Sequence, residues 1–557
     1  MKVWYDKMQE KEISIEIKKP ESIILLGLLI TILFLELSVT LPSPIAFGDE
    51  GFHIRMAQYI SENKEYPVWL PFWGTKIYKN GFFRPPLWNL LQGSFYLIFG
   101  FSEILTKTLT PFIASIMTGL TVFLIGKKIY NKKIGFIASI IAVTIPSFVT
   151  YSVLFYTDIL FVLNFSLFAL SLVMAVKGEK NRYWIISGIF GAFTLLTKDP
   201  GYTIFPLLIL SFFYQIYKKN ELRVLFKKYL ITILLITTIS GTYYLRNFIY
   251  YGTPSCALPG FDSSGCRPSY EYKNETPEAP NTHEPGLFEN GLMNYISFAY
   301  GMNQIGPFVF PFVFFGFICG LVIIGHKKEK SDIMLILALI SFFPIFYLST
   351  GRSEDSARYT LGLIPVIALI AANYYEKIYD FVGNYRRQLA LIVFILVIFF
   401  SFMNLINKLN DARHYDKANQ QYVGYKLFSP SFFQATDFIK RNTTKDALII
   451  TTWDSQTEYN AQRNVVGLRT LPDSNDIING DLNLTLSRLK INGITHVFIQ
   501  KFSINDQYCP LKFVQLLEGN PKNFVKIYEN GPSLDECIKA GGCDGNILYE
   551  IKYDLKK

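Results

Sequence analysis

Charged residues are scarce in this sequence, and apolar residues are abundant. Charged side chains make up 18% of the 557 residues, against 50% for hydrophobic residues. This composition excludes an ordinary water-soluble enzyme of the same length and indicates a membrane protein with several spans. Cysteine is also scarce, and none of the six cysteines has zinc-finger or Cys-x-x-Cys spacing, so those metal and redox motifs are excluded as well.

The basic residues do not gather in one place, although the formal charge is +10. A nucleic-acid binder concentrates such charge on one face or arm, whereas here Lys and Arg lie mainly in short loops between apolar runs. That distribution is typical of membrane proteins, whose basic loops stay on the cytoplasmic side. We therefore expect membrane lipids, and no nucleic acid, among the partners of this chain.

Apolar runs of membrane length divide the first part of the chain. The first run, Ile23 to Leu41, follows a Lys-rich tail and has no clear cleavage site. We interpret it as a retained anchor with the N-terminus in the cytoplasm. The later runs bring the number of predicted spans to about eleven, an odd number that places the C-terminus outside. The best-bounded of them are 106–126, 134–151, 183–197, 229–245 and 388–406.

The composition becomes polar near residue 410. We expect a transmembrane domain over residues 1–409, with outer loops 42–105 and 246–303, and a soluble extracytoplasmic α/β domain over 410–557. The predicted helices of this second domain are 432–441, 482–492 and 511–518, and its predicted strands are 447–453, 464–468, 495–500, 524–528 and 547–551. The expected fold class is therefore a polytopic α-helical membrane protein with a C-terminal α/β domain, which lacks a Rossmann or Walker phosphate loop.

Most cysteines fall in segments predicted to lie on the outer side. The spacings of Cys256 with Cys266 and of Cys537 with Cys543 suit local disulfides in an oxidising compartment, and reduced thiols are the alternative. Glycosylation sequons also fall on this side and give weak support to the same topology. Their asparagines are Asn274, Asn442 and Asn483.

Two adjacent carboxylates follow the first span, at the point where the chain leaves lipid for water. Asp49 and Glu50 stand between two glycines, and His53 comes shortly after them. Ionised groups at this depth are costly unless they face protein or a wet cavity, so a functional site is the first hypothesis. The simpler alternative is a helix start, with Asp49 as N-cap, Glu50 in the first turn and His53 in ordinary packing.

A second motif, Phe-Arg-Pro-Pro-Leu at residues 83–87, opens a short apolar stretch that we expect to lie along the membrane interface. Further polar residues stand at span ends on the same predicted side. They are Asp158, Lys198, Arg246, Arg352, Arg358 and Tyr359. Some have plain structural alternatives: Asp158 as a first-turn anion, Lys198 as a snorkelling cation and Arg246 as an anchor of its span end.

Taken in order, these motifs resemble those of the membrane-embedded GT-C glycosyltransferases, in particular the family of dolichyl-phosphate-mannose protein mannosyltransferases and aminoarabinose transferases. The resemblance covers residues 23–372 and is carried by the order, topology and side of the motifs together. The motifs are Phe-Gly-Asp-Glu at 47–50, the motif at 83–87, Tyr-Thr-Asp at 156–158, Leu-Leu-Thr-Lys-Asp-Pro at 195–200, Leu-Arg-Asn-Phe at 245–248, and Arg-Tyr at 358–359 followed by Pro365.

The resemblance implies a cell-membrane enzyme that moves a sugar from a polyprenyl (dolichyl) phosphate to a protein, lipid or glycan acceptor on the outer face. It implies Asp49 as the catalytic base. The other catalytic residues expected are Glu50 beside it and Asp158, which helps to shape the site. The substrate-binding residues expected with this reaction are His53, Arg84, Lys198, Arg246, Arg352, Arg358 and Tyr359.

The sequence departs from the aminoarabinose branch just before its Pro-Pro pair. In that branch a Glu that joins a metal site precedes a Lys, and Phe83 and Arg84 occupy those positions here. We therefore expect no metal ion and no cofactor, and we expect Arg84 to act as a permanent cation.

The reaction chemistry agrees with these residue types. A sugar on a polyprenyl phosphate carries a good leaving group, so one base and a set of cations suffice for a single displacement with inversion. A glycosidase needs two carboxylates that flank the bond, and Asp49 and Glu50 are poor candidates for that arrangement. Two alternatives stay open: a transporter or lipid flippase, for which no internal repeat is found, and a surface-assembly protein acting through its outer domain.

Overall fold

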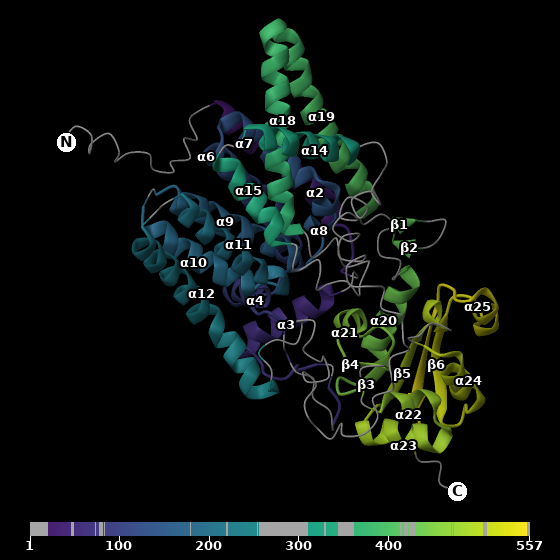
Figure 1. Cartoon of the computed structure of the whole chain (residues 1–557). Helices are drawn as coiled ribbons and strands as arrows, with labels where there is room; N and C mark the ends of the chain where they lie inside the picture. Colours follow the sequence, from purple (N-terminus) through teal and green to yellow (C-terminus); the bar gives the residue numbers. More distant parts are fainter. Residues whose placement is uncertain are drawn as a thin grey trace.

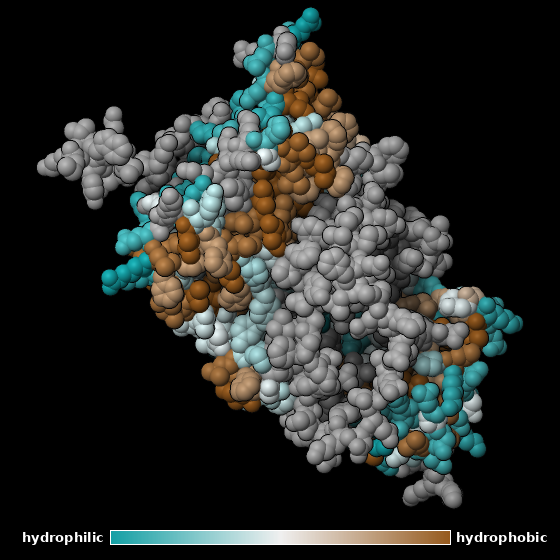
Figure 2. Space-filling view, in the orientation of Figure 1, coloured by the Kyte–Doolittle hydropathy of each residue, from teal (hydrophilic) through white to brown (hydrophobic). Residues whose placement is uncertain are grey.

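The structure is a computed structural model of the 557-residue chain, and a helical bundle and a sheet domain lie at its two ends (Figure 1). The bundle is covered mainly by hydrophobic residues, whereas hydrophilic residues cover most of the visible sheet domain (Figure 2). The structure describes residues 20–45, 49–72, 74–76, 82, 84–178, 180–218, 221–252, 254, 310–327, 330–342, 361–412, 415–416, 421–422, 429–468, 471, 473–504 and 509–553.

The second and third predicted spans are not regular α-helices throughout. The predicted second span is one helical stretch made of α5 (Glu103–Phe112), the π-helical turn η1 (Ile113–Thr118) and α6 (Gly119–Ile129). The predicted third span bends by 63° between α7 (Lys132–Thr144) and α8 (Pro146–Ser152). A residue before proline avoids helical backbone angles, and Ile145, with ψ of 129°, accounts for this bend.

Each predicted span coincides with a helix or helical stretch. The other helices concerned are α2 (Pro20–Thr40), α9 (Asp158–Val176), α10 (Arg182–Leu195), α11 (Ile204–Tyr217), α12 (Leu222–Tyr251), α14 (Phe310–Lys327), α15 (Lys330–Ser341), α18 (Ile364–Tyr385) and α19 (Arg387–Ala412). Among the described residues, five helices are long and apolar enough to cross a membrane, or six if α7 and α8 form one span. The membrane character is confirmed, and the number of about eleven spans stays a prediction.

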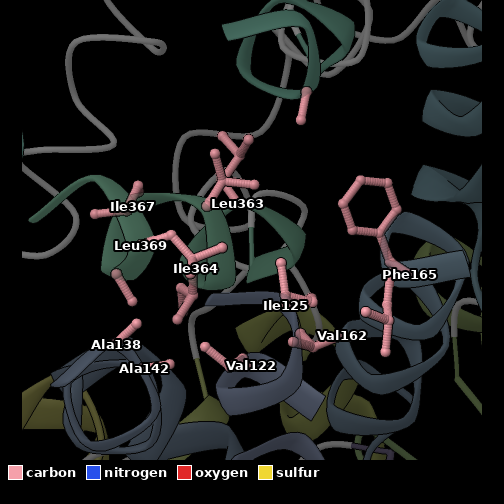
Figure 3. Packing of buried hydrophobic residues seen from close by; sticks show 14 of the residues in the cluster. Val122, Ile125, Ala138, Ala142, Val162, Phe165, Leu363, Ile364, Ile367 and Leu369 are labelled. Atoms are coloured by element: carbon pink, nitrogen blue, oxygen red, sulfur yellow. The ribbon is translucent and has the colours of Figure 1, made fainter. Parts of the chain in front are cut away.

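The core of the bundle is apolar and closely packed. Side chains from α6, α7, α9 and the start of α18 converge on one another, among them Val122, Ala138, Phe165 and Ile367 (Figure 3). At the α6–α7 crossing, a Cβ on Gly126 would lie 2.5 Å from the Cα of Gly135. Such close backbone approach needs small residues, which is the usual way in which membrane helices pack.

The C-terminal sheet has five strands in the order β4-β3-β5-β7-β6. Its strands are β3 (Leu448–Thr451), β4 (Asn464–Gly467), β5 (His496–Gln500), β6 (Phe524–Asn530) and β7 (Asn546–Ile551). Strand β3 pairs parallel with both β4 and β5, whereas β7 pairs antiparallel with both β5 and β6. The parallel strands β3 and β5 are buried along their whole length, as expected for strands covered on both faces.

All the predicted helices and strands of this domain are confirmed. The helices are α20 (Pro430–Asn442), α23 (Leu482–Asn492) and α24 (Leu511–Gly519). Three short helices were not predicted: α21 (Asp454–Ala461), α22 (Ser474–Asn479) and α25 (Leu534–Ala540). Cys537 and Cys543 form the disulfide that their spacing suggested, whereas Cys256 and Cys266 lie outside the described residues.

Candidate active site

Two short helices outside the spans carry the first two motifs. Helix α3 (Glu50–Asn63) starts directly after Asp49, and α4 (Leu87–Phe99) starts after the Pro-Pro pair and lies where an interfacial helix was predicted. Figure 1 shows α3 between α4 and α21 of the sheet domain. The buried His53 ring on α3 bonds through Nδ1 to the Asn89 side-chain oxygen of α4 at 2.9 Å, so the two helices are joined at this point.

Asp49 forms a two-point ion pair with Arg84. The Arg84 Nη1 and Nη2 atoms lie 2.8 Å and 3.2 Å from the two Asp49 carboxylate oxygens. The guanidinium also lies 4.3 Å above the Phe52 ring, which fixes its orientation. Asp49 occupies the N-cap position of α3, but its side chain makes no capping hydrogen bond to the helix and pairs with Arg84 instead. Both side chains stay about one-third exposed and therefore accessible.

Glu50 lies in different surroundings from its neighbour. Its side chain is fully buried, and one carboxylate oxygen accepts a hydrogen bond of 3.1 Å from the backbone N–H of Phe155. Phe155 stands three residues before Asp158, in the loop that leads into α9. Glu50 thus attaches the start of α3 to the segment that delivers Asp158.

Asp158 and Lys198 form a buried ion pair. Asp158 is the first residue of α9, and the Lys198 ammonium contacts its carboxylate. Two further hydrogen bonds hold the neighbouring segments: Leu87 N–H donates to the Leu196 carbonyl at 2.8 Å, and Asn164 donates to Thr197 Oγ1 at 3.0 Å. Helix α9, the Pro-Pro motif and the segment before Pro200 are thereby joined.

Arg246 supports the outer loop. Its guanidinium donates to the backbone carbonyl of Phe82 at 2.9 Å and to that of Pro67, and it lies 4.9 Å above the Tyr66 ring. These contacts hold the segment that precedes Arg84. The other three predicted substrate-binding residues, Arg352, Arg358 and Tyr359, lie outside the described residues.

A further carboxylate reaches this site from the sheet domain. Asp454 begins α21, and burial raises the pKa of its carboxyl to about 6, opposed by a hydrogen bond from the Ser455 backbone. The charge of Asp49 raises the same pKa further, and the charge of Arg84 lowers it, so all three groups lie within electrostatic reach. The sequence analysis missed Asp454 because α21 is short and has no apolar repeat. The available signal was an acidic residue directly after a buried strand.

The fold matches solved structures of membrane glycosyltransferases at low sequence identity. An oligosaccharyltransferase from Archaeoglobus fulgidus matches with a TM-score of 0.61 at 14% identity, covering 95% of this chain and 74% of that chain. ArnT from Cupriavidus metallidurans matches with a TM-score of 0.59 at 10% identity, covering 95% and 97%. The arabinofuranosyltransferase AftD from Mycobacteria also has a TM-score of 0.59 at 10% identity, covering 96% and 40%.

These likenesses define the class: the chain has the fold of a GT-C type membrane glycosyltransferase, which confirms the resemblance drawn from the motifs. At the level of sequence, the family described as dolichyl-phosphate-mannose-protein mannosyltransferase matches residues 83–244. This segment begins with the Pro-Pro motif and ends within α12, so it includes Arg84, Asp158 and Lys198. Among curated proteins, no sequence matches significantly.

The described part of the site does not fit a divalent metal ion. Within the described part of the chain, no three His, Cys, Asp or Glu residues cluster in a way that could hold one. The Asp49 carboxylate faces a guanidinium, and the His53 ring bonds to Asn89. Metal sites in proteins usually need three or more protein ligands, or several waters. We therefore assign no step to a metal.

Proposed function

We propose that this chain transfers a sugar from a polyprenyl phosphate to an acceptor at the outer face of the membrane, with Asp49 as the base. The observation that carries the proposal is the accessible Asp49–Arg84 pair at the start of α3. It stands in a fold shared with a structure of ArnT bound to undecaprenyl phosphate and one of the oligosaccharyltransferase AglB bound to dolichol-phosphate. These two ligands support a lipid-linked donor for this chain.

The proposed reaction is a single displacement at the anomeric carbon of the donor sugar. Asp49 accepts the proton of the acceptor nucleophile as the new glycosidic bond forms. The bond from the anomeric carbon to the phosphate oxygen breaks, and the polyprenyl phosphate departs with that electron pair. Attack from the side opposite to the leaving group inverts the anomeric configuration.

Arg84 has two tasks in this proposal. Its two-point contact orients the Asp49 carboxylate. Its fixed positive charge stabilises, in this proposal, the negative charge that develops on the departing phosphate. Lys198 balances the charge of the buried Asp158. Arg352 and Arg358 are the further candidates for the phosphate, on the strength of the sequence motif alone.

A protein is the first acceptor to test. One of the similar structures is the oligosaccharyltransferase tethered with an acceptor peptide, and the dolichyl-phosphate-mannose-protein mannosyltransferase family is named for a protein acceptor. The sheet domain also brings Asp454 within electrostatic reach of the Asp49–Arg84 pair. Lipid and glycan acceptors are the alternatives that the experiment must separate.

The proposed orientation places the N-terminus in the cytoplasm and the sheet domain outside. Lys-rich loops support it, since the ends of α6 and α9 meet where the Lys177 ammonium donates to the Lys128 carbonyl at 2.8 Å. The Lys-rich tail precedes the N-terminal end of α2, whereas α3 follows its C-terminal end. The sheet domain contacts α3. The basic loops and the candidate site thus belong to opposite faces.

The test is transfer by purified protein. Radiolabelled polyprenyl-phosphate sugars are incubated with the protein and with separated protein, lipid and glycan fractions of a lysate. Label that moves into one fraction, with release of polyprenyl phosphate, identifies donor and acceptor together. If no donor loses its sugar while the lipid itself is bound, the proposed enzyme activity is wrong and a transport function is favoured.

A further inference from the structure

Helix α21 of the sheet domain packs directly against the start of α3. A Cβ on Gly51 would lie 2.6 Å from the Ser455 carbonyl oxygen and 2.8 Å from the Tyr459 Cβ. No larger residue fits at this position without a shift of backbone. Gly51 follows Asp49 by two residues, so this contact lies within the first turn next to the candidate base.

An ion pair between the partly exposed Arg55 and the buried Glu458 lies next to this contact. The Arg55 Nε atom donates to a Glu458 carboxylate oxygen at 2.7 Å, and the Glu458 side chain is only 1% exposed. Within the described residues, the second Glu458 oxygen is buried without a hydrogen-bond partner. Arg55 is itself held by Gln58, which accepts from Nη1 at 3.1 Å. Glu458 therefore depends on Arg55 to stabilise its buried charge.

The same helix contacts the segment that leads to Asp158. Tyr459 packs with Ile45, Ile54 and Phe155, and the Asn460 side chain donates to the Ile45 carbonyl at 3.3 Å. Leu154 and Tyr156 join the apolar core beneath the sheet. α21 thus contacts α3 and the loop before α9, which carry Asp49 and Asp158 respectively.

Asp454 and Glu458 stand four residues apart on α21 and therefore on one helical face. Asp454 lies within reach of the Asp49–Arg84 pair, while Glu458 pairs with Arg55 on the same α3 helix. Rotation of α3 about its own axis would break the Arg55–Glu458 ion pair and would displace Asp49 at the same time. The Arg55–Glu458 ion pair and the close packing at Gly51 both hold α3 against α21.

We propose that Glu458, acting through Arg55, is a positioning residue for the transfer reaction, because it holds α3 in the rotation that keeps the Asp49 carboxylate in place. The proposal rests on Asp49 being the base. It gives the sheet domain a part in catalysis that is separate from any binding of the acceptor. Displacement of a catalytic group by about 1 Å is enough to cost on the order of 100-fold in rate.

The test compares full-length variants in the transfer assay. Glu458→Gln and Arg55→Gln should each lower kcat by roughly 10- to 100-fold, with the affinity for the polyprenyl-phosphate sugar unchanged. The exchanged pair, Arg55→Glu with Glu458→Arg, should recover much of the loss. Arg488→Gln is the matched control, since it removes a charge from an exposed pair with Asp476 in the same domain and should leave kcat unchanged.

Thermal unfolding of each variant separates a positioning role from loss of fold. Wild-type kcat in both folded single variants would overturn the proposal, and so would equal losses of kcat and donor affinity without recovery in the exchanged pair. Failure of the proposed function has a different signature, since wild-type protein would then transfer no sugar. If the wild type transfers sugar and Asp49→Asn retains full turnover, the base assignment fails and the positioning proposal falls with it.

Discussion

Adjacent carboxylates in this chain have unlike surroundings, and the difference suggests unlike roles. Asp49 is accessible and paired with Arg84, whereas Glu50 is fully buried and accepts a hydrogen bond from the backbone N–H of Phe155. A group that exchanges a proton with a substrate must be reachable, so Asp49 suits a base. A buried carboxylate that accepts a hydrogen bond from a backbone N–H is better suited to holding a loop in place. The sequence analysis proposed both as catalytic, and the geometry favours that role only for Asp49.

The buried pair of Asp158 and Lys198 gives a prediction about stability. Lys198→Met removes one partner of a buried ion pair, which should lower the free energy of unfolding by about 3–5 kcal/mol. Lys198→Arg keeps the charge and should lose less. Thermal unfolding in detergent measures the difference. Equal melting temperatures for the wild type and Lys198→Met would show that the pair does not stabilise the protein.

Arg84 gives a prediction about metal. Because Asp49 faces a guanidinium, and Phe83 stands where a related branch has a metal-binding Glu, we expect sugar transfer to persist in excess EDTA. The measurement is the initial rate of transfer with and without chelator. Loss of activity that a single added divalent metal restores would contradict this expectation.

Two carboxyls of α21 give a prediction about pH. The pKa of Glu458 rises from 4.5 to about 7 and that of Asp454 from 3.8 to about 6, in both cases chiefly through burial. Raised pKa values favour the folded state while the groups are protonated, so this stabilisation is lost as the pH rises through these values. The melting temperature should therefore fall between the ordinary pKa values, at about pH 4, and the raised ones, at about pH 7.

Glu458→Gln is the control for this effect, since it removes the larger of the two titrations. The variant should show a shallower fall of melting temperature over the same range. An identical slope for the wild type and the variant would mean that Glu458 does not titrate there.

Helix packing in the bundle depends on close approach at small residues. A Cβ on Gly135 of α7 would lie 2.5 Å from the Phe123 carbonyl oxygen of α6, so Gly135→Val forces the helices apart. We expect a loss of about 1–3 kcal/mol in stability, measured by thermal unfolding in detergent. Gly27→Val in α2 is the control, since no atom lies within 4 Å of its added Cβ. Equal losses in both variants would point to helix propensity as the cause.

Most elements were predictable because their signals are local. Apolar runs such as Asp158–Val176 predicted the helices of the bundle, and the alternation of predicted helices and strands indicated the α/β domain. The number of spans was less predictable, since α10 and α11 have 14 residues each, fewer than a straight crossing needs. Helix α21 was missed because its eight residues carry no apolar repeat.

The candidate site was predictable only as a set of residues. The motifs identified Asp49, Arg84, Asp158 and Lys198, and the structure joins them in two ion pairs. Their pairing, the burial of Glu50 and the approach of Asp454 arise from contacts between distant segments. No pattern along the chain encodes such contacts, and they become visible only in the fold.

At the scale of the whole molecule, the topology gives a prediction that needs no activity. A cysteine introduced at the exposed Asn442 of α20 should react with a membrane-impermeant thiol reagent added outside the cell. One introduced at the exposed Lys180 should react only after the membrane is opened. Labelling at residue 180 from outside would overturn the proposed orientation.

The sheet domain and the bundle form one catalytic unit in this account. α21 packs on α3, and a second contact ties the outer loop to the domain, where Thr75 Oγ1 donates to the Asn492 side-chain oxygen at 2.9 Å. Both contacts lie between segments hundreds of residues apart in the chain. The central claim is that this arrangement presents Asp49 as the base for sugar transfer.

The most direct test is the turnover of Asp49→Asn beside that of Glu50→Gln, with donor affinity measured for both. Asparagine keeps the shape of Asp49 but cannot accept the proton, so turnover should fall on the order of 100-fold or more while donor binding survives. Glu50→Gln should lower turnover far less, because its amide oxygen still accepts from Phe155. Near-wild-type turnover in Asp49→Asn would contradict the account and make Asp158 the next candidate for the base.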